Sequence, residues 1–359
     1  MIEEELRRAL AALVDGLAPR AAAGAVERLM TGYRGAGEAA APVLRDRADV
    51  VAYAAYRMPA TFAAVASALE AFAVRAADWR PGSHLDVGGG TGAAVWAAAE
   101  VWDGTATAGP EGGARRTTVL DRSGPALALG RELAGASAAD AVRTAEWRHR
   151  SLTGQDAGGE RSEGGPGDAG LPTADLVTVS YVLGELPERD RLAVVDAAAR
   201  AGQAVVVTEP GTPGGYARII AARDQLAAAG LRVLAPCPHS APCPMVPGED
   251  WCHFAARVNR SSLHRQVKGG SLPYEDEKFS YVAAARPGVT GDPADGRIVR
   301  RPQKRKGQVL LELCTADSGL RPATVTKRHG TDYRRARDAK WGDAWPPAPD
   351  GGTGGGAES

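Results

Sequence analysis

The spacing of apolar residues along the first 75 positions predicts helices. In the N-terminal segment these residues recur every three or four positions and so share one face of a helix. They are Leu6, Leu10, Leu13, Val14 and Leu17. The same spacing runs from Val50 through Val65 to Phe72. Pro59 interrupts this second segment. Because the first turn of a helix does not need the amide that proline lacks, we expect a new helix to begin there.

From residue 76 to residue 230 the pattern changes to short β-branched runs separated by alanine-rich stretches. Each run is apolar and ends at Gly, Asp, Ser or Pro, which is typical of strands. The runs cover residues 84–88, 117–121, 174–180 and 204–210. Strands that alternate with helices predict an α/β domain with a parallel, doubly wound sheet.

The rest of the chain has a different amino-acid composition. Residues 231–345 contain cysteines, prolines and then many basic residues, which indicates a second module or a large insertion after the sheet. Glycine-rich stretches near 104–114 and 154–170 predict surface loops, and residues 346–359 predict a disordered tail.

A glycine-rich segment, Asp86-Val-Gly-Gly-Gly-Thr-Gly92, follows the first predicted strand and opens a helix. Gly88, Gly90 and Gly92 let the backbone turn tightly and approach a ligand at a helix N-terminus, although a purely structural turn would also use them. The GxGxG spacing and the preceding Asp86 are typical of S-adenosylmethionine-binding folds, whereas dinucleotide enzymes prefer GxGxxG.

Two further residues join this predicted cofactor site. Asp121 ends the next strand, where a carboxylate accepts hydrogen bonds from ribose hydroxyls, and Ser180 ends the strand over 174–180. Ser180-Tyr181-Val-Leu-Gly-Glu185 stands where amine-methylating enzymes of nucleic acids carry an Asn/Asp-Pro-Pro-Tyr type motif. No cysteine nucleophile lies there either. Tyr181 and Glu185 either line the pocket or cap the strand, so the sequence predicts cofactor binding without identifying a catalytic residue.

All four cysteines lie in the C-terminal part of the chain, at Cys237, Cys243, Cys252 and Cys314. Thiolates suit zinc or an iron–sulfur cluster. The spacing lacks the CxxC knuckle of zinc ribbons and two of the cysteines precede proline, which favours the cluster. A mixed zinc site with His239 or His253 and a set of buried free thiols are the alternatives.

Charge is balanced over the whole chain but not locally. Lys+Arg and Asp+Glu both total 43, which argues against a generic nucleic-acid coat. Between 297 and 340, however, thirteen basic residues face four acidic ones, a pattern that favours phosphate contact over a merely solvated face. The candidate RNA-binding residues are Arg300, Arg301, Lys304, Arg305, Lys306, Lys327 and Arg328. No apolar run of about 18 residues and no signal peptide is evident, so we expect a cytoplasmic protein outside the membrane.

Several segments together resemble a known family, the small-ribosomal-subunit methyltransferase-like proteins, known mainly as mitochondrial ribosome assembly factors and having bacterial members. The cysteine segments and LPYEDEKFSY are the most specific, since generic methyltransferases lack them. The matching segments are YAAYRMPATF, DVGGGTG, SYVLGEL, VTEPGTPGG, CPHSAPCP, DWCHFAARVNR, LPYEDEKFSYVA and RIVRRPQKRKGQVLLELC.

The resemblance implies a Rossmann-like S-adenosylmethionine-dependent methyltransferase fold with an N-terminal helical region and a C-terminal cysteine-containing basic module. It also implies binding to small-subunit rRNA during ribosome assembly and a [4Fe–4S] cluster held by residues matching the four cysteines. An active rRNA methyltransferase and a small-molecule methyltransferase with a structural zinc site are the competing hypotheses. The oligomeric state does not follow from the sequence.

Overall fold

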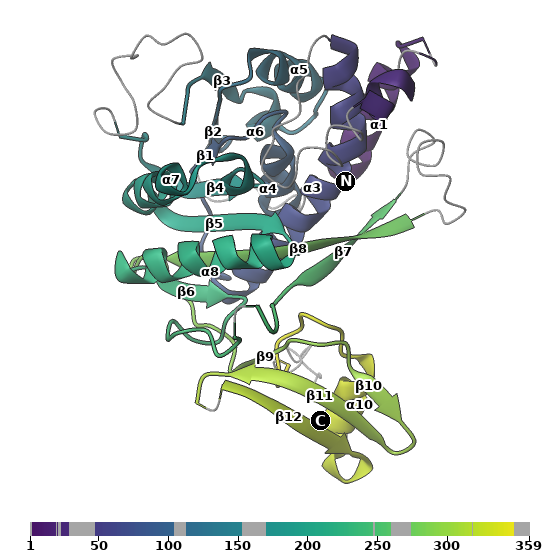
Figure 1. The fold of residues 1–359 in the computed structure, drawn as a ribbon, viewed down its shortest axis with the longest axis vertical. Helices are drawn as coiled ribbons and strands as arrows, with labels where there is room; N and C mark the ends of the chain where they lie inside the picture. Colours follow the sequence, from purple (N-terminus) through teal and green to yellow (C-terminus); the bar gives the residue numbers. More distant parts are fainter. Residues whose placement is uncertain are drawn as a thin grey trace, which may run out of the picture.

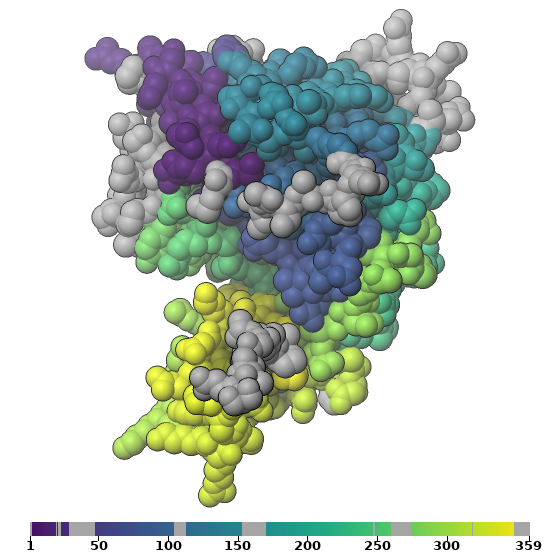
Figure 2. Space-filling model, turned by 180° about the vertical axis from the view of Figure 1, so that it is seen from behind, coloured from purple at the N-terminus to yellow at the C-terminus, as the bar shows by residue number. Residues whose placement is uncertain are grey.

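The computed structural model describes residues 2–18, 20, 23–28, 47–103, 113–152, 170–246, 248–259, 274–317 and 319–347. Within these ranges the chain forms a large eight-stranded sheet covered by helices and a smaller four-stranded sheet at one end (Figure 1). Seen from behind, the smaller sheet and its helix form a lobe that projects from the main body (Figure 2). The expected glycine-rich loops and the tail lie almost entirely outside the described residues.

The large sheet has the strand order β3-β2-β1-β4-β5-β8-β6. The eighth strand, β7, also pairs with β8. The strands are β1 Ser83–Val87, β2 Arg116–Asp121, β3 Glu146–His149, β4 Ala174–Ser180, β5 Gly202–Pro210, β6 Arg232–Ala235, β7 Phe254–Asn259 and β8 Tyr274–Ala285. The strands from β3 to β5 are parallel, whereas β8 runs antiparallel to β5, β6 and β7. The fold is thus a Rossmann-like methyltransferase fold with a mixed sheet.

The predicted fold class is confirmed, with a difference in the sheet. The four predicted strands correspond to β1, β2, β4 and β5. The sheet is not parallel throughout, because β8 inserts between β5 and β6 in the opposite direction. It therefore takes in three strands from beyond residue 230.

Helices cover both faces of the large sheet. On one face α3 Arg47–Arg75, α4 Ala93–Trp102 and α5 Gly124–Gly135 share a core centred on Phe72, Trp96 and Leu133. On the other, α7 Glu188–Ala201 and α8 Pro213–Ala228 pack on inward-facing strand residues (Figure 1). The start of α8 follows its sequence: the Thr212 hydroxyl accepts from Gly215 N, and Pro213 occupies the first turn.

The N-terminal helical region contains α1 Ile2–Asp15 and the long α3. The expectation that a helix begins at Pro59 is wrong, because Pro59 lies inside α3. Met58, Ala60 and Phe62 around it are buried in the core, and this tertiary packing outweighs the missing backbone hydrogen bond. None of the helices in the described part of the chain is long and apolar enough to cross a membrane.

The C-terminal lobe contains an antiparallel sheet of β9 Gly296–Ile298, β10 Gln303–Arg305, β11 Gln308–Thr315 and β12 Gly319–Thr326. A short 3-10 helix, η2 Lys327–His329, and α10 Thr331–Asp338 follow. The lobe has a core of its own, made by Ile298, Val309, Leu311, Leu313, Val325 and Ala336.

Candidate functional site

The glycine loop joins β1 to α4 with its backbone in the left-handed region. Gly88, Gly90 and Gly92 have φ of 68°, 54° and 83°, a conformation that favours glycine. A Cβ on Gly88 would lie 2.4 Å from Val182 Cγ2, and one on Gly92 would lie 2.5 Å from the Trp147 ring. Neighbouring side chains therefore hold the loop on these two sides.

Gly90 differs from the other two glycines because its outer side is open. A Cβ there would meet only Asp121 Oδ2, at 3.9 Å. The Asp121 carboxylate accepts from Gly90 N at 2.9 Å and from Ser123 N at 2.7 Å, while burial raises its pKa. The predicted ribose-binding carboxylate thus lies against the loop at the point where the loop is open to a ligand.

Asp86 lies fully buried beneath the loop. Thr178 Oγ1 donates to Asp86 Oδ1 at 2.8 Å, and Asp86 Oδ2 has no hydrogen-bond partner among the described residues. A Cβ on Gly89 would lie 2.3 Å from this free oxygen. Burial raises the pKa of Asp86 to about 7. A buried carboxylate oxygen without a donor is a costly feature that a bound donor group would satisfy.

The end of β4 holds a strained residue. Tyr181 has φ of 60°, which is rare for a residue with a side chain and occurs most often at functional sites. Its hydroxyl donates to Glu277 Oε1 at 3.2 Å, and Arg57 Nη2 contacts the same oxygen at 3.3 Å. The Ser180 hydroxyl beside it is buried and has no hydrogen-bond partner within the described ranges.

Sequence reasoning missed Arg57 and Glu277 as partners of Tyr181. Arg57 comes from α3 and Glu277 from β8, far from Tyr181 in the chain. The only available signal was that YAAYRMPATF, SYVLGEL and LPYEDEKFSYVA all belong to the matching segments. Periodicity alone could not place the three segments together.

The loop after β4 also places Glu185 near the predicted cofactor site. Burial raises the pKa of Glu185 to about 7, and Arg122 Nη2 approaches its carboxylate at 4.0 Å. The loop backbone is held from β5, where Glu209 accepts from Leu183 N at 3.0 Å and from Arg218 Nε at 2.6 Å. Glu185 is therefore an exposed acid, with 37% of its side chain accessible, on a loop whose backbone is held from β5.

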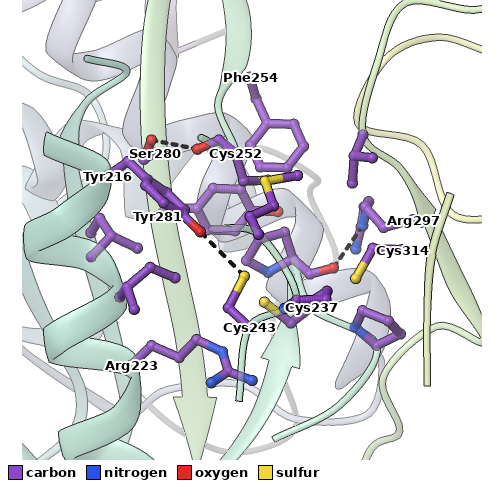
Figure 3. Close-up of a pocket in the computed structure, with 17 residues that line it drawn as sticks. Tyr216, Arg223, Cys237, Cys243, Cys252, Phe254, Ser280, Tyr281, Arg297 and Cys314 are labelled. Carbon is purple, nitrogen blue, oxygen red and sulfur yellow. Dashed lines mark hydrogen bonds between the residues drawn. The ribbon is translucent and has the colours of Figure 1, made fainter. Parts of the chain in front are cut away.

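The structure brings all four cysteines to the lining of one cavity that is partly open to solvent (Figure 3). Cys237 follows β6, Cys243 lies in the next loop and Cys252 precedes β7. Cys314 comes from β11 of the C-terminal lobe. The cavity therefore lies where the lobe meets the main body.

Polar side chains surround the thiols. Tyr216 Oη lies 3.2 Å from Cys243 Sγ, and His239 Nε2 lies 3.8 Å from Cys314 Sγ. The second candidate histidine, His253, is instead stacked on Trp251, with ring centroids 5.4 Å apart. Of the two histidines, only His239 is therefore shown contacting a thiol.

The arrangement of the thiols bears on which metal would fit. Among the described residues, no group of three or more Cys, His, Asp or Glu side chains is placed so that it could hold one metal ion. In a cubane cluster each cysteine binds a different iron, so the sulfur atoms surround a larger object than a single ion. Four soft donors around a shared pocket have the chemistry that both zinc sites and iron–sulfur clusters use.

Burial favours the protonated form of three of the four thiols. Burial raises the pKa of Cys237, raises that of Cys252 well above its usual range and raises that of Cys314 to about 12. Because metal ligands must be thiolates, binding at this cavity would release protons.

Most predicted RNA-binding residues gather at the far end of the lobe. Arg305 pairs with Gln308, Gln308 pairs with Thr326, and Lys327 N donates to the carbonyl of Gly307 at 3.2 Å. This register places the β10–β11 turn beside η2. We call the exposed residues there the basic tip: Lys304, Arg305, Lys306, Lys327 and Arg328.

The two arginines before β10 lie apart from the basic tip in the register. Arg300 forms an ion pair with Asp250, and Arg301 is exposed. Cys314 pairs with Leu320 and Arg297 at the opposite end of β11. The lobe therefore has a cysteine end that faces the main body and a basic end that faces away from it.

Comparison with known proteins gives a consistent family assignment. A family model described as mitochondrial small ribosomal subunit Rsm22 matches residues 47–346. The human ribosome assembly protein METTL17, mitochondrial, is 30% identical over 322 residues, covering 82% of this chain and 62% of that protein. The Saccharomyces cerevisiae ribosome assembly protein RSM22, mitochondrial, is 25% identical over 182 residues, covering 33% of this chain and 29% of that protein.

Among solved structures, the N-methyltransferase NodS from Bradyrhizobium japonicum aligns with 11% identity and a TM-score of 0.36, covering 62% of this chain and 86% of that one. The chain spans less than two thirds of the length of the curated relatives above. Both relatives are mitochondrial by name, and a cytoplasmic location for this chain stays a prediction.

Proposed function

The chain belongs to the family of mitochondrial small ribosomal subunit Rsm22, and from its three candidate sites we propose that it acts in small-subunit assembly by binding rRNA. In this proposal the main body holds S-adenosylmethionine, the cysteine cavity holds a [4Fe–4S] cluster and the basic tip contacts RNA. One observation carries this proposal: the two ends of the lobe differ in chemistry. The strand β11 begins beside the basic tip and has Cys314 near its other end.

The basic tip has the chemistry of a phosphate-binding surface. Its five side chains are exposed and concentrated at one end of a small sheet. Arginine and lysine that neutralise phosphates release condensed counterions, which supplies most of the sequence-independent affinity for nucleic acid. Arg301 is also exposed but lies apart from the basic tip, and Arg300 is paired with Asp250.

The glycine loop has the features of a cofactor site. The open side of Gly90 and the Asp121 carboxylate would receive the ribose, and the free oxygen of Asp86 would receive a donor from the methionine end. Gly88 and Gly92 shape the loop, and Ser180 offers a hydroxyl at the end of β4. When bound, S-adenosylmethionine supplies an electrophilic methyl group. No base or nucleophile for methyl transfer is identified among the described residues, so the proposal is one of binding.

The cysteine cavity would fix the lobe to the main body. Three thiols come from the region around β6 and β7, and the fourth comes from the lobe. Iron–sulfur ligation by all four would link the two parts through metal–sulfur bonds. The lobe, and with it the basic tip, would then be held in one orientation.

Co-sedimentation with small-subunit particles tests the proposal directly. Replacing Arg305, Lys306, Lys327 and Arg328 together with glutamine should make the negative slope of log K against log salt shallower by up to about 4, roughly one for each phosphate that is no longer neutralised. A matched control replaces Arg7, Arg8, Arg189 and Arg200, which are exposed on helices of the main body. Equal slopes for the two variants would refute the basic tip as the RNA-binding surface.

A further inference from the structure

One face of α8 is directed at the cysteine cavity. Tyr216, Ile219, Ile220 and Arg223 all line it, and their spacing places them on the same side of a helix (Figure 3). None of these residues was singled out by the sequence, because α8 has no cysteine and no motif of metal sites.

Tyr216 is placed to donate a hydrogen bond to a cysteine sulfur. Its side chain is buried, and its oxygen lies 3.2 Å from Cys243 Sγ. A free thiol could be either donor or acceptor in this pair. A metal-bound cysteine is a thiolate without a proton, so the phenol must then be the donor.

Arg223 brings a buried positive charge to the same cavity. Only 1% of its surface is exposed. Its Nη2 donates to the carbonyls of His239 and Ala241, and its Nη1 pairs with Asp224 at 2.8 Å. Its Nε is buried and has no partner among the residues that the structure describes. The side chain thus clamps the loop between Cys237 and Cys243 and keeps one N–H unsatisfied.

A second guanidinium lies on the opposite side of the cavity. Arg297 is also buried, and its Nε donates to the carbonyl of Pro236 at 2.9 Å. The Asp224 carboxylate is more than half exposed, so it balances the buried charges only weakly. Burying charge with little opposite charge nearby is costly, and a tetrathiolate metal centre would add negative charge beside these two arginines.

We propose that Tyr216 and Arg223 are positioning residues of the metal centre, Tyr216 by donating to the Cys243 sulfur and Arg223 by clamping the Cys237–Cys243 loop beside an anionic occupant. This inference rests on the proposed function, since it requires a metal at the four cysteines. Hydrogen bonds and positive charge near cluster sulfurs stabilise the reduced, more negative form, so both residues raise the reduction potential.

Tyr216→Phe tests the hydrogen bond while keeping the ring. In anaerobically reconstituted full-length protein, we expect a lower midpoint potential by EPR-monitored titration and roughly 10- to 100-fold faster iron release to a chelator. Tyr333→Phe, on α10 away from the cavity, is the matched control and should match the wild type. A wild-type potential and release rate in Tyr216→Phe would overturn the role of Tyr216.

Arg223→Gln and Arg223→Lys separate charge from geometry. Both lose the clamp and should release iron faster than wild type, but only the glutamine variant should also lower the potential strongly. Arg232→Gln, which alters an exposed arginine, is the control. If Arg223→Gln does not fold, Arg223→Lys and Tyr216→Phe still decide the matter, and wild-type release from both would overturn the inference.

A separate variant tests whether the four-cysteine metal centre exists at all. Cys243→Ser should bind less iron than wild type. If it retains full iron and the same EPR spectrum, the proposed four-cysteine centre is wrong whatever the α8 variants do.

Discussion

The glycine loop and the cysteine cavity are built in opposite ways. The loop is seven contiguous residues whose shape comes from left-handed glycines and from Val182 and Trp147 packed against them. The cavity gathers three thiols from the connection between β6 and β7 of the main body and a fourth from β11 of the lobe. A site of the first kind is encoded locally, whereas a site of the second kind exists only when two parts of the molecule dock.

The largest expected effect comes from removing the cysteine that crosses between the two parts. Cys314→Ser should abolish the brown colour of the reconstituted protein and loosen the C-terminal lobe, because metal binding energies of roughly 10 kcal/mol contribute to folding at such sites. Absorption spectroscopy, iron and sulfide assays and limited proteolysis of the lobe measure the two consequences.

Ala316→Ser is a suitable control for this variant, since Ala316 is exposed two residues further on. The main body should keep its cofactor affinity in Cys314→Ser, because the glycine loop does not depend on the lobe. A variant that keeps its colour, or one whose glycine loop fails together with the lobe, would contradict the contrast between the two sites.

Within the loop, two glycine-to-alanine changes should act differently. Gly92→Ala places a Cβ against Trp147 at a left-handed φ and should cost about 2 to 5 kcal/mol of folding free energy from strain and overpacking. Gly90→Ala meets open space and should cost only about 1 to 2 kcal/mol, while it blocks the ligand. Thermal unfolding and calorimetry with S-adenosylhomocysteine distinguish these outcomes. Equal losses of stability would show that the open side of Gly90 has no special role.

A further effect concerns pH. The folded-state pKa of Asp86 is raised from 3.8 to about 7, so the native protein holds a proton that the unfolded chain releases. The protonation of Asp86 therefore makes the free energy of unfolding fall as pH rises from about 4 to 7, by about 1.4 kcal/mol per pH unit. The total loss amounts to at most a few kcal/mol. In Asp86→Asn this protonation is lost, so urea unfolding across this window should show a smaller fall than in wild type. Asp15→Asn, at an exposed position, should reproduce the wild-type curve.

Much of the main body could be predicted because its strands carry their signal locally. The runs at 84–88, 117–121, 174–180 and 204–210 each correspond to a strand, shifted by at most two residues at either end. The glycine loop was equally local. The short strand β3 was missed because Glu146–His149 has three exposed residues and only one buried one.

The rest depended on contacts between distant segments. Nothing in LPYEDEKFSYVA says that its strand inserts antiparallel between β5 and β6, and that insertion is what brings Glu277 to Tyr181. The prediction that a helix begins at Pro59 was wrong for a similar reason, because the buried residues on both sides of Pro59 keep α3 continuous. Arg300 was grouped with the basic run, although its partner Asp250 lies fifty residues earlier.

The place of Cys314 on β11 has a consequence for how the protein is made. During synthesis the other three cysteines leave the ribosome first, and the fourth follows only after the main body and most of the small sheet. A centre that needs all four can close only after residue 314 has been made. A nascent chain that stops before Cys314 would still contain the glycine loop but would lack the fourth thiol, so it could not complete the proposed centre.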